Sequence, residues 1–316
     1  MDTVKTAVMR LSIPEQKTFK GQCFPLVITP VQEYNSRDLE FWCSWIKDNN
    51  NWLEDELLQY GAILFRDFPI TSAEDFDVFV KMFGYKSFPY VGGAAPRTVV
   101  TGNVFTANEA PSSAKIPYHH EMAQVPNFPK VLFFQCDIAP SSGGQTTLVP
   151  SNVIYEQMLE REPEFVQRLE KDGVRYIRVL PESDDPTSAI GRGWKSTYLT
   201  DNKEDAIRKA KEQGTTVEWL DNGCLKTITE VLPATRVDTR TGKKVWFNSI
   251  IAAYLGWQDS RNERTKSVVF ANGDPMDARV MHVLEEVFEA NAVDFNWKKV
   301  ICYHFEIEII LNKQVS

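Results

Sequence analysis

The sequence predicts a β-rich α+β protein, a jelly roll or barrel decorated with helices. The first observation is a series of short β-like segments in the second half of the chain, at residues 216–220, 225–228, 235–238 and 245–247. The second is a group of helical patterns nearer the front, at residues 36–46, 52–60 and 72–83. Short strands of this kind bury their apolar faces by packing as two sheets or closing into a barrel. We see no internal repeat or linker in residues 1–316, which favours one domain.

The first helices follow from the spacing of large apolar residues. Such residues recur at helical spacing over 39–46, after Ser36, which we expect to cap the helix. A second helical piece, residues 52–60, is predicted to end at Gly61, because glycine readily adopts the left-handed conformation that closes a helix. The apolar run 62–65 then favours a buried strand.

Local signals place the other helices. The Ser72-Ala-Glu-Asp sequence has the pattern of a capping box and is predicted to open a helix. Pro163 is expected to divide the helical segment 152–169 into two pieces, since proline breaks a helix interior. The TRTG sequence at 239–242 predicts a hairpin turn. Two further helices are expected at residues 203–213 and 277–290.

Composition excludes several kinds of partner. The 316 residues carry a formal net charge of -8 without a basic run, so we expect binding neither to nucleic acid nor to an anionic membrane. No apolar segment approaches the roughly 20 residues that cross a bilayer, and the polar N-terminus lacks the pattern of a signal peptide. Five cysteines without CxxC spacing indicate a reduced compartment. We expect a cytoplasmic protein; the oligomeric state is unknown from sequence.

The most informative stretch, residues 116–150, opens with two of the chain's four histidines beside a carboxylate, His119-His120-Glu121. In an extended backbone His119 and Glu121 project to the same face, while His120 points the other way. With a second imidazole from elsewhere, this pair would form the two-histidine-one-carboxylate site of non-haem Fe(II) oxygenases. The alternative is an ordinary polar strand end. A Gly-Gly turn and exposed hydroxyls, Gly143-Gly144-Gln145-Thr146, follow the next apolar run and favour the metal site.

Several longer motifs resemble a known family. They are PYHHEMAQ, FPKVLFFQC and GGQTTLVP within 117–150, GAILFRDFPI at 61–70, TGNVFTANEAP at 101–111, DDPTSAIGRGWKSTYLT at 184–200 and KKVWFNSIIAAYLGW at 243–257. Together they resemble the taurine dioxygenase (TauD/TfdA) family, in particular its plant clavaminate-synthase-like branch. The resemblance extends over roughly residues 20 to 299.

The resemblance implies a double-stranded β-helix, a form of jelly roll, with helical N-terminal and inserted segments. It also implies an oxygenase that uses Fe(II), 2-oxoglutarate and O2 to oxidise, typically hydroxylate, a small organic substrate. The family's H-x-[DE] metal ligands fall on His119 and Glu121. The threonine that contacts the 2-oxoglutarate carboxylate falls on Thr146, with Thr147 as the neighbouring alternative. Asn103 is expected to line the same pocket.

The resemblance stops after Lys299. The family continues into a strand that carries a distal iron-binding histidine, near the position of Lys313 here, followed by an arginine that binds 2-oxoglutarate. Neither residue is present in register, and the last arginine of the chain is Arg279. Because a site with one ligand fewer binds metal weakly, we expect weak or absent activity in this chain.

The remaining histidines are not expected to complete the site. His282 lies on a predicted helix and is expected at the surface or in helix packing. His304 is expected to be incidental to a divergent tail, residues 300–316, in which the last strands of the fold are lost or replaced. The tail alternates apolar Phe305, Ile307, Ile309 and Leu311 with acidic residues, so it could dock as a strand.

Two hypotheses of different class follow. The first is an Fe(II)- and 2-oxoglutarate-dependent dioxygenase of small organic substrates. The second is a non-catalytic truncated isoform that is degraded or binds and interferes with a full-length enzyme. A cupin-like metal-binding protein is a third possibility that the long motifs disfavour. Arg192 and Lys195, in the polar loop, either contact an acidic substrate or are simply solvated.

Overall fold

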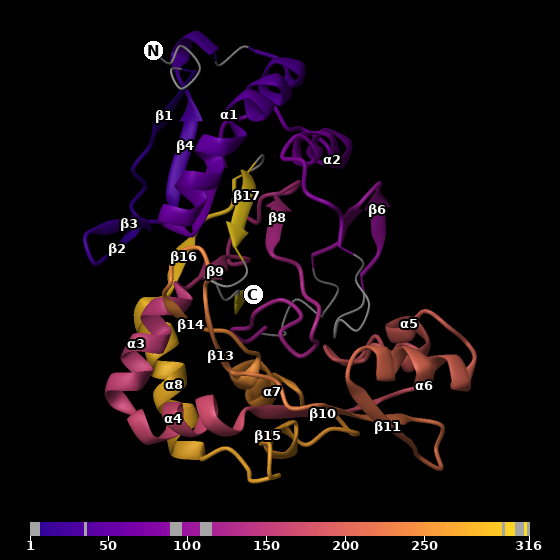
Figure 1. Ribbon diagram of the computed structural model, residues 1–316. Helices are drawn as coiled ribbons and strands as arrows, with labels where there is room; N and C mark the ends of the chain where they lie inside the picture. The colour runs from indigo at the N-terminus through magenta and orange to yellow at the C-terminus, as the bar shows by residue number, and fades with distance from the viewer. Residues whose placement is uncertain are drawn as a thin grey trace.

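A five-stranded sheet forms the upper half of the molecule in the computed structural model, which describes residues 7–34, 37–88, 97–107, 116–298, 301–306 and 313–314 (Figure 1). Its strands, in spatial order, are β1 (Val8–Arg10), β4 (Leu26–Pro30), β5 (Ala62–Arg66), β17 (Ile301–Glu306) and β8 (Val131–Gln135). Strands β4 and β5 run parallel, and the other neighbouring pairs are antiparallel.

Helices cover one face of this sheet, and the alternation of side chains along its strands separates two cores. Helices α1 (Leu39–Tyr60) and α2 (Ala73–Lys81) pack on the face to which Ile63 and Phe65 point. On the other face, Ala62 and Leu64 pack with residues of a second sheet. That sheet consists of β16 (Val293–Phe295), β9 (Thr146–Leu148) and β18 (Lys313–Gln314). The two packed sheets form the β-rich centre that the sequence predicts.

Helix α1 is longer than the sequence predicts. The two expected pieces are one helix, which begins after Asp38, whose side chain accepts a hydrogen bond from the Phe41 N–H at 3.0 Å. The predicted cap, Ser36, lies outside the described residues. Leu53 and Leu57 are fully buried against the sheet, so packing continues the helix across the asparagine-rich stretch between the two predicted pieces.

The cap of helix α2 confirms the predicted capping box. The Ser72 hydroxyl accepts a hydrogen bond from the Asp75 N–H at 3.1 Å, and the Asp75 carboxylate accepts one from the Ser72 N–H at 3.2 Å.

Strand β17 places the predicted divergent tail inside the first sheet. Tyr303 pairs with Leu64 of β5 on one side and with Phe134 of β8 on the other. Residues 301–306 therefore dock as a strand, as their alternation suggested, and fill the space between β5 and β8. The remaining alternating residues of the tail, Ile307, Ile309 and Leu311, lie outside the described residues.

The lower half is built from helices around a further sheet. These helices are α3 (Ser151–Arg161), α4 (Pro163–Asp172), α7 (Ile250–Gly256) and α8 (Ala278–Asn291), and they pack with β10 (Val174–Leu180) and β15 (Val268–Phe270). Pro163 is the first residue of α4, so the predicted division is confirmed. Helix α7 was not predicted. Its run of apolar residues is buried on all sides and therefore lacks helical periodicity.

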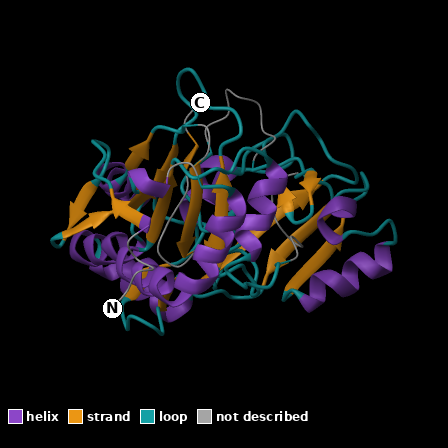
Figure 2. Cartoon of the chain, turned by 90° about the horizontal axis from the view of Figure 1, so that it is seen from above, coloured by secondary structure: helices purple, strands orange, loops and turns teal. Residues whose placement is uncertain are grey.

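An insert extends this sheet at one end of the molecule (Figure 2). It contains α5 (Trp194–Tyr198), α6 (Lys203–Glu212), β11 (Thr215–Trp219) and β12 (Leu225–Thr229), and the sheet order is β11-β12-β10-β15. Strands β13 (Thr235–Val237) and β14 (Lys244–Trp246) form the hairpin predicted around the TRTG turn.

Short elements complete the described chain: β2 (Lys17–Phe19) with β3 (Gln22–Phe24), β6 (Val99–Thr101) with β7 (Val104–Phe105), and the 3-10 turns η2 (Gln32–Tyr34) and η3 (Arg264–Lys266). Within the described residues, no helix combines the length and the apolar character needed to cross a membrane.

Candidate metal site

The segment that leads into β8 brings His119 and Glu121 together. The Nδ1–H group of His119 donates a hydrogen bond to the Pro117 carbonyl at 2.9 Å. Because Nδ1 is used in this contact, Nε2 is the ring nitrogen that remains to bind a metal. His119 Nε2 lies 3.8 Å from Oε2 of Glu121. Two neighbouring ligands of one divalent ion, each about 2.1 Å from it, lie about 3 Å apart, so the pair is wider than a bound pair would be, and a small side-chain movement would bring both atoms onto one ion.

Arg97 neutralises the carboxylate of this pair. Its guanidinium donates a hydrogen bond to Glu121 Oε2 at 3.1 Å, and both side chains are largely buried. Burial acts to raise the pKa of Glu121, but the positive charge of Arg97 beside it outweighs burial and lowers that pKa. Glu121 is therefore ionised at neutral pH, as a metal ligand must be.

His120 has a structural role, which agrees with the prediction that it points away from the pair. It is fully buried, and its Nδ1 donates to the Asn248 carbonyl at 3.1 Å while Nε2 lies 2.7 Å from the Ser151 hydroxyl. Burial lowers the pKa of His120 to about 3, so the ring is neutral at physiological pH. His120 thus anchors the site segment to α3 and to Asn248, two residues before α7.

The backbone that presents the pair is not the strand from which its shared face was predicted. Residues 116–120 are irregular, and a turn begins at Glu121. Met122 adopts a positive φ of 59°, and the Ala123 N–H donates to the His120 carbonyl at 3.2 Å. The convergence of His119 with Glu121 is as expected, but a turn tied down by His120 produces it.

Thr146 and Thr147 lie on β9, directly after the Gly-Gly turn, where Gly143 and Gly144 adopt φ values of 68° and 67°. The Thr146 hydroxyl accepts a hydrogen bond from the Trp297 indole N–H at 3.0 Å, and the Thr147 hydroxyl donates to Asp294. The two hydroxyls thus have different partners. None of the described contacts joins Thr146 to His119 or Glu121, and its role stays a prediction.

Asn103 lies on the exposed turn between β6 and β7. Its backbone N–H donates to Asp77 Oδ1 at 3.4 Å, which attaches the turn to α2. Among the described contacts, none links the Asn103 side chain to the His119–Glu121 pair. Its place in the pocket therefore also stays a prediction.

The third metal donor is not found among the described residues, where no three His, Cys, Asp or Glu side chains are grouped to hold an ion. His282 is exposed on α8, 3.5 Å from Glu286, as expected. Arg279 pairs with Glu162. The backbone of His304 lies in β17, opposite Ile63 and Phe133.

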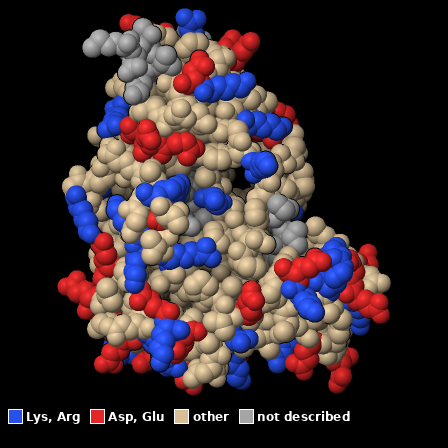
Figure 3. All heavy atoms as spheres, viewed as in Figure 1, with Lys and Arg blue, Asp and Glu red and all other residues tan. Residues whose placement is uncertain are grey.

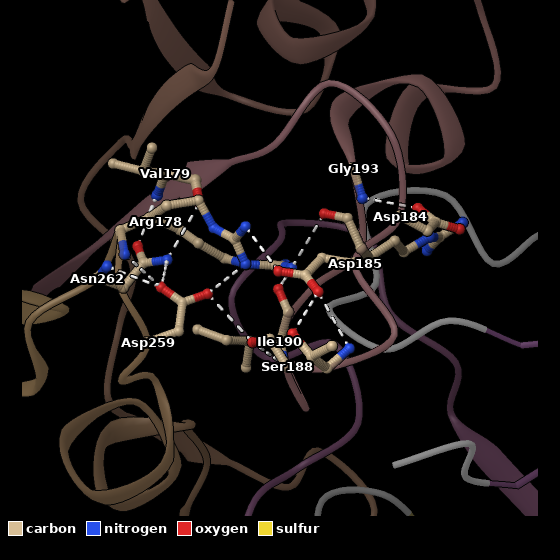
Figure 4. A network of polar contacts seen from close by, with 12 residues as sticks. Arg178, Val179, Asp184, Asp185, Ser188, Ile190, Gly193, Asp259 and Asn262 are labelled. Carbon is tan, nitrogen blue, oxygen red and sulfur yellow. Dashed lines mark hydrogen bonds and ion pairs between the residues drawn. The ribbon is translucent and has the colours of Figure 1, made fainter. Parts of the chain in front are cut away.

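The polar loop 181–195 is held in place by its own acidic residues (Figure 4). The Asp184 carboxylate accepts from the Gly193 N–H at 2.7 Å, and the Asp185 carboxylate from Arg261 at 2.8 Å. Arg178 of β10 donates to the Ile190 carbonyl at 2.5 Å.

The two cations suggested for an acidic substrate belong to this loop region. Lys195 pairs with Glu182 at 2.9 Å, and Arg192 is buried and donates to the Ser196 carbonyl at 2.9 Å. Arg192 is therefore not solvated, as the second alternative expected, but is held within the loop, and a substrate contact of either cation stays a prediction.

Acidic and basic side chains are interspersed on the face shown in Figure 3. A cavity of about 300 Å³ lies between the β2–β3 hairpin, the end of α1 and the start of α3. The residues that line it include Phe24, Tyr60 and Val153 but none of the predicted site residues. The chemistry of the His119–Glu121 pair is therefore not associated with this cavity.

Comparison with known proteins identifies the family of the chain. Residues 25–299 match the model of the taurine catabolism dioxygenase TauD, TfdA family. The chain is 48% identical over 290 residues to a clavaminate synthase-like protein of Arabidopsis thaliana, which covers 91% of this chain and 88% of that protein. The chain belongs to the TauD/TfdA family, whose members are dioxygenases that depend on Fe(II) and 2-oxoglutarate. The match ends at residue 299, the predicted limit of the resemblance.

Solved structures show the same fold. A taurine dioxygenase from Burkholderia xenovorans has a TM-score of 0.51 at 13% identity, covering 98% of this chain and 83% of that chain. The structure of AAD-2 in complex with Mn(II) and N-oxalylglycine has a TM-score of 0.50 at 11% identity, covering 95% and 90%. These likenesses support the predicted jelly-roll dioxygenase fold. The comparisons do not favour the truncated, non-catalytic alternative.

Sequence reasoning missed Arg97. No helical or strand periodicity marks it, and it is 24 residues from its carboxylate partner. One signal was available, because Arg97 is the single charged residue between Lys86 and Glu109. A lone charge in an uncharged stretch needs a partner when the stretch is buried.

Proposed function

We propose that this protein is an Fe(II)- and 2-oxoglutarate-dependent dioxygenase that oxidises a small organic substrate, with His119 and Glu121 as metal ligands. The observation that carries the proposal is the convergence of His119 Nε2 and Glu121 Oε2 at 3.8 Å, in a chain that belongs to a family of dioxygenases. The Mn(II) and N-oxalylglycine bound by AAD-2, which has the same fold, are compatible with a divalent metal and an oxalyl-containing cosubstrate here.

Each side chain of the pair presents one donor atom to a metal. The Pro117 carbonyl holds the Nδ1 proton of His119, so Nε2 has its lone pair available, and Glu121 is ionised because Arg97 lies beside it. When bound, Fe(II) with 2-oxoglutarate supplies the activation of O2 that substrate oxidation requires. We expect weaker metal binding than in a site with three protein ligands.

Thr146 is proposed to contact the carboxylate of 2-oxoglutarate. Its hydroxyl oxygen accepts from the Trp297 indole, which leaves the hydroxyl hydrogen to donate to a carboxylate. Thr147 is the weaker candidate, because its hydroxyl already donates to Asp294.

The proposal is tested by succinate formation from 2-oxoglutarate in the full chain, with Fe(II), ascorbate and O2 and without added substrate. Wild type is expected to form succinate, and His119→Ala to lose at least about 100-fold of this turnover, since a direct ligand matters more than an outer-shell partner. His282→Ala is the matched control, because this histidine is exposed on α8. No succinate from wild type, or equal rates from wild type and His119→Ala, would overturn the proposal.

A further inference from the structure

The cation beside Glu121 comes from a different part of the chain. Arg97 precedes the β6–β7 hairpin, whereas Glu121 lies on the turn that leads toward β8. The Arg97–Glu121 hydrogen bond of 3.1 Å therefore connects the hairpin to the metal-site segment. The side chains are 16% and 13% exposed, so water screens this ion pair little.

Both ends of the Arg97 guanidinium are used. Nη2 donates to Glu121 Oε2, while Nη1 donates to the carbonyl oxygens of Ala107 at 2.9 Å and Thr106 at 3.3 Å. These carbonyls follow β7, so the residues after the hairpin return to Arg97, which precedes it. The two contacts fix the orientation of the Arg97 guanidinium. A planar guanidinium can bridge three acceptors in this way, whereas an ammonium is a single point charge.

The contact is compatible with metal binding by the same carboxylate. A carboxylate oxygen has two lone pairs, so Oε2 can accept from Arg97 in one direction and face His119 Nε2 in the other. The carboxylates that ligate metals are commonly held by such an outer hydrogen bond, which orients them.

We propose that Arg97 is a positioning residue of the metal site: it holds the Glu121 carboxylate toward His119 and couples the β6–β7 hairpin to the site. This inference rests on the proposed function, in which His119 and Glu121 bind the metal. It assigns Arg97 no contact with the substrate, because the two ends of its guanidinium are bound to Glu121 and to the hairpin carbonyls.

Two effects of Arg97 on a bound cation oppose each other. Its positive charge repels a divalent ion, so its removal would strengthen binding if charge alone decided. The Thr106 and Ala107 carbonyls, however, direct their negative ends at the guanidinium and offset part of that repulsion. Without Arg97, Glu121 would lose the contact that orients it and would be free to rotate away from His119. Orientation is therefore expected to dominate.

The test measures Co(II) binding to the full chain through its visible absorption, without turnover. Arg97→Met is expected to weaken Co(II) binding about 10- to 100-fold and to alter the absorption band, as loss of an outer hydrogen bond to a ligand does. Arg97→Lys is expected to recover part of the affinity, because an ammonium can still contact Glu121. Arg261→Met is the matched control: this arginine is also 16% exposed and pairs with carboxylates, in the loop network.

A second measurement does not involve a metal. Thermal unfolding of the metal-free Arg97→Met, Glu121→Gln and double variants is expected to show non-additive shifts, because the two side chains contact each other. Additive shifts would contradict the coupling. Co(II) affinity that Arg97→Met leaves unchanged or makes tighter would overturn the positioning role alone. Absence of Co(II) binding in wild type would overturn the proposed function and, with it, the role of Arg97 toward a metal.

Discussion

Two arginines of equal exposure, Arg97 and Arg261, lie in clusters of opposite character. Arg261 contacts two carboxylates, Asp185 at 2.8 Å and Asp259 at 2.5 Å. Asp259 also accepts the backbone N–H groups of Arg261 and Asn262, and Asp185 accepts that of Thr187. Most hydrogen-bonding groups of this cluster have partners, although two carboxylates face the one Arg261 guanidinium and its Nε–H has no partner among the described residues. The cluster joins the loop 181–195 to the residues after α7 (Figure 4).

The cluster around Arg97 is arranged differently. One carboxylate faces one guanidinium, and an imidazole nitrogen with its lone pair directed away from Pro117 stands 3.8 Å from the same carboxylate. An imidazole nitrogen and a carboxylate oxygen that face each other are the donor types of a divalent metal site. In the loop cluster the carboxylates are held by several N–H donors and stabilise a loop, whereas His119 and Glu121 present two donor atoms of metal-ligand type to each other, although both clusters contain buried charges.

The largest expected effect is the loss of Co(II) affinity when the Glu121 carboxylate, which faces the His119 imidazole, is replaced by an amide. Glu121→Gln should weaken Co(II) binding by at least about 100-fold, because an amide is a neutral and poor ligand and the loss concerns a direct donor. The check is the same absorption titration. If Glu121→Gln binds Co(II) as tightly as wild type does, the metal site does not include Glu121. The proposed difference between the Arg261 cluster and the His119–Glu121 pair would then be wrong.

The corresponding substitution in the loop cluster, Asp259→Asn, should lower the stability of the fold and leave Co(II) affinity unchanged. Asp259→Asn removes the charge that Arg261 and two backbone N–H groups contact, and is expected to lower the free energy of unfolding by about 2 kcal/mol. Urea unfolding measures the loss, with Co(II) affinity as the control readout. A decrease in Co(II) affinity without a loss of stability would mean that the loop contributes to the site.

Features encoded by neighbouring residues were predictable from the sequence. The Ser72 capping box, the division at Pro163 and the TRTG hairpin each depend on a few consecutive residues, and each is present. The His119–Glu121 pair was also predictable, because its members are two residues apart and the surrounding motifs are long. Local chemistry decides such features whatever the rest of the chain does.

Features that depend on distant partners were not predictable. Helix α1 continues through an asparagine-rich stretch because Leu53 and Leu57 pack on the sheet. The position of β17 between β5 and β8 requires two strands from the first half of the chain. The contact of Arg97 with Glu121 depends on how the β6–β7 hairpin folds back. In each case the partner is far away in the sequence, whereas periodicity and capping signals involve only residues a few positions apart.

The smallest expected effect is a pH-dependent change in melting temperature when Asp185 of the loop cluster is replaced. Hydrogen bonds from Thr187 and Arg261 lower the pKa of Asp185 to about 2, from about 3.9 in an unfolded chain. Because the folded-state pKa is depressed, the stabilisation is fully present above about pH 4 and is lost as the pH falls toward 2. Asp185→Asn should therefore lower the melting temperature at pH 6, and the difference from wild type should shrink between pH 4 and pH 2. Thermal unfolding across this range measures it. A difference that stays constant with pH would show that the Asp185 charge does not stabilise the loop and that shape alone holds this cluster together.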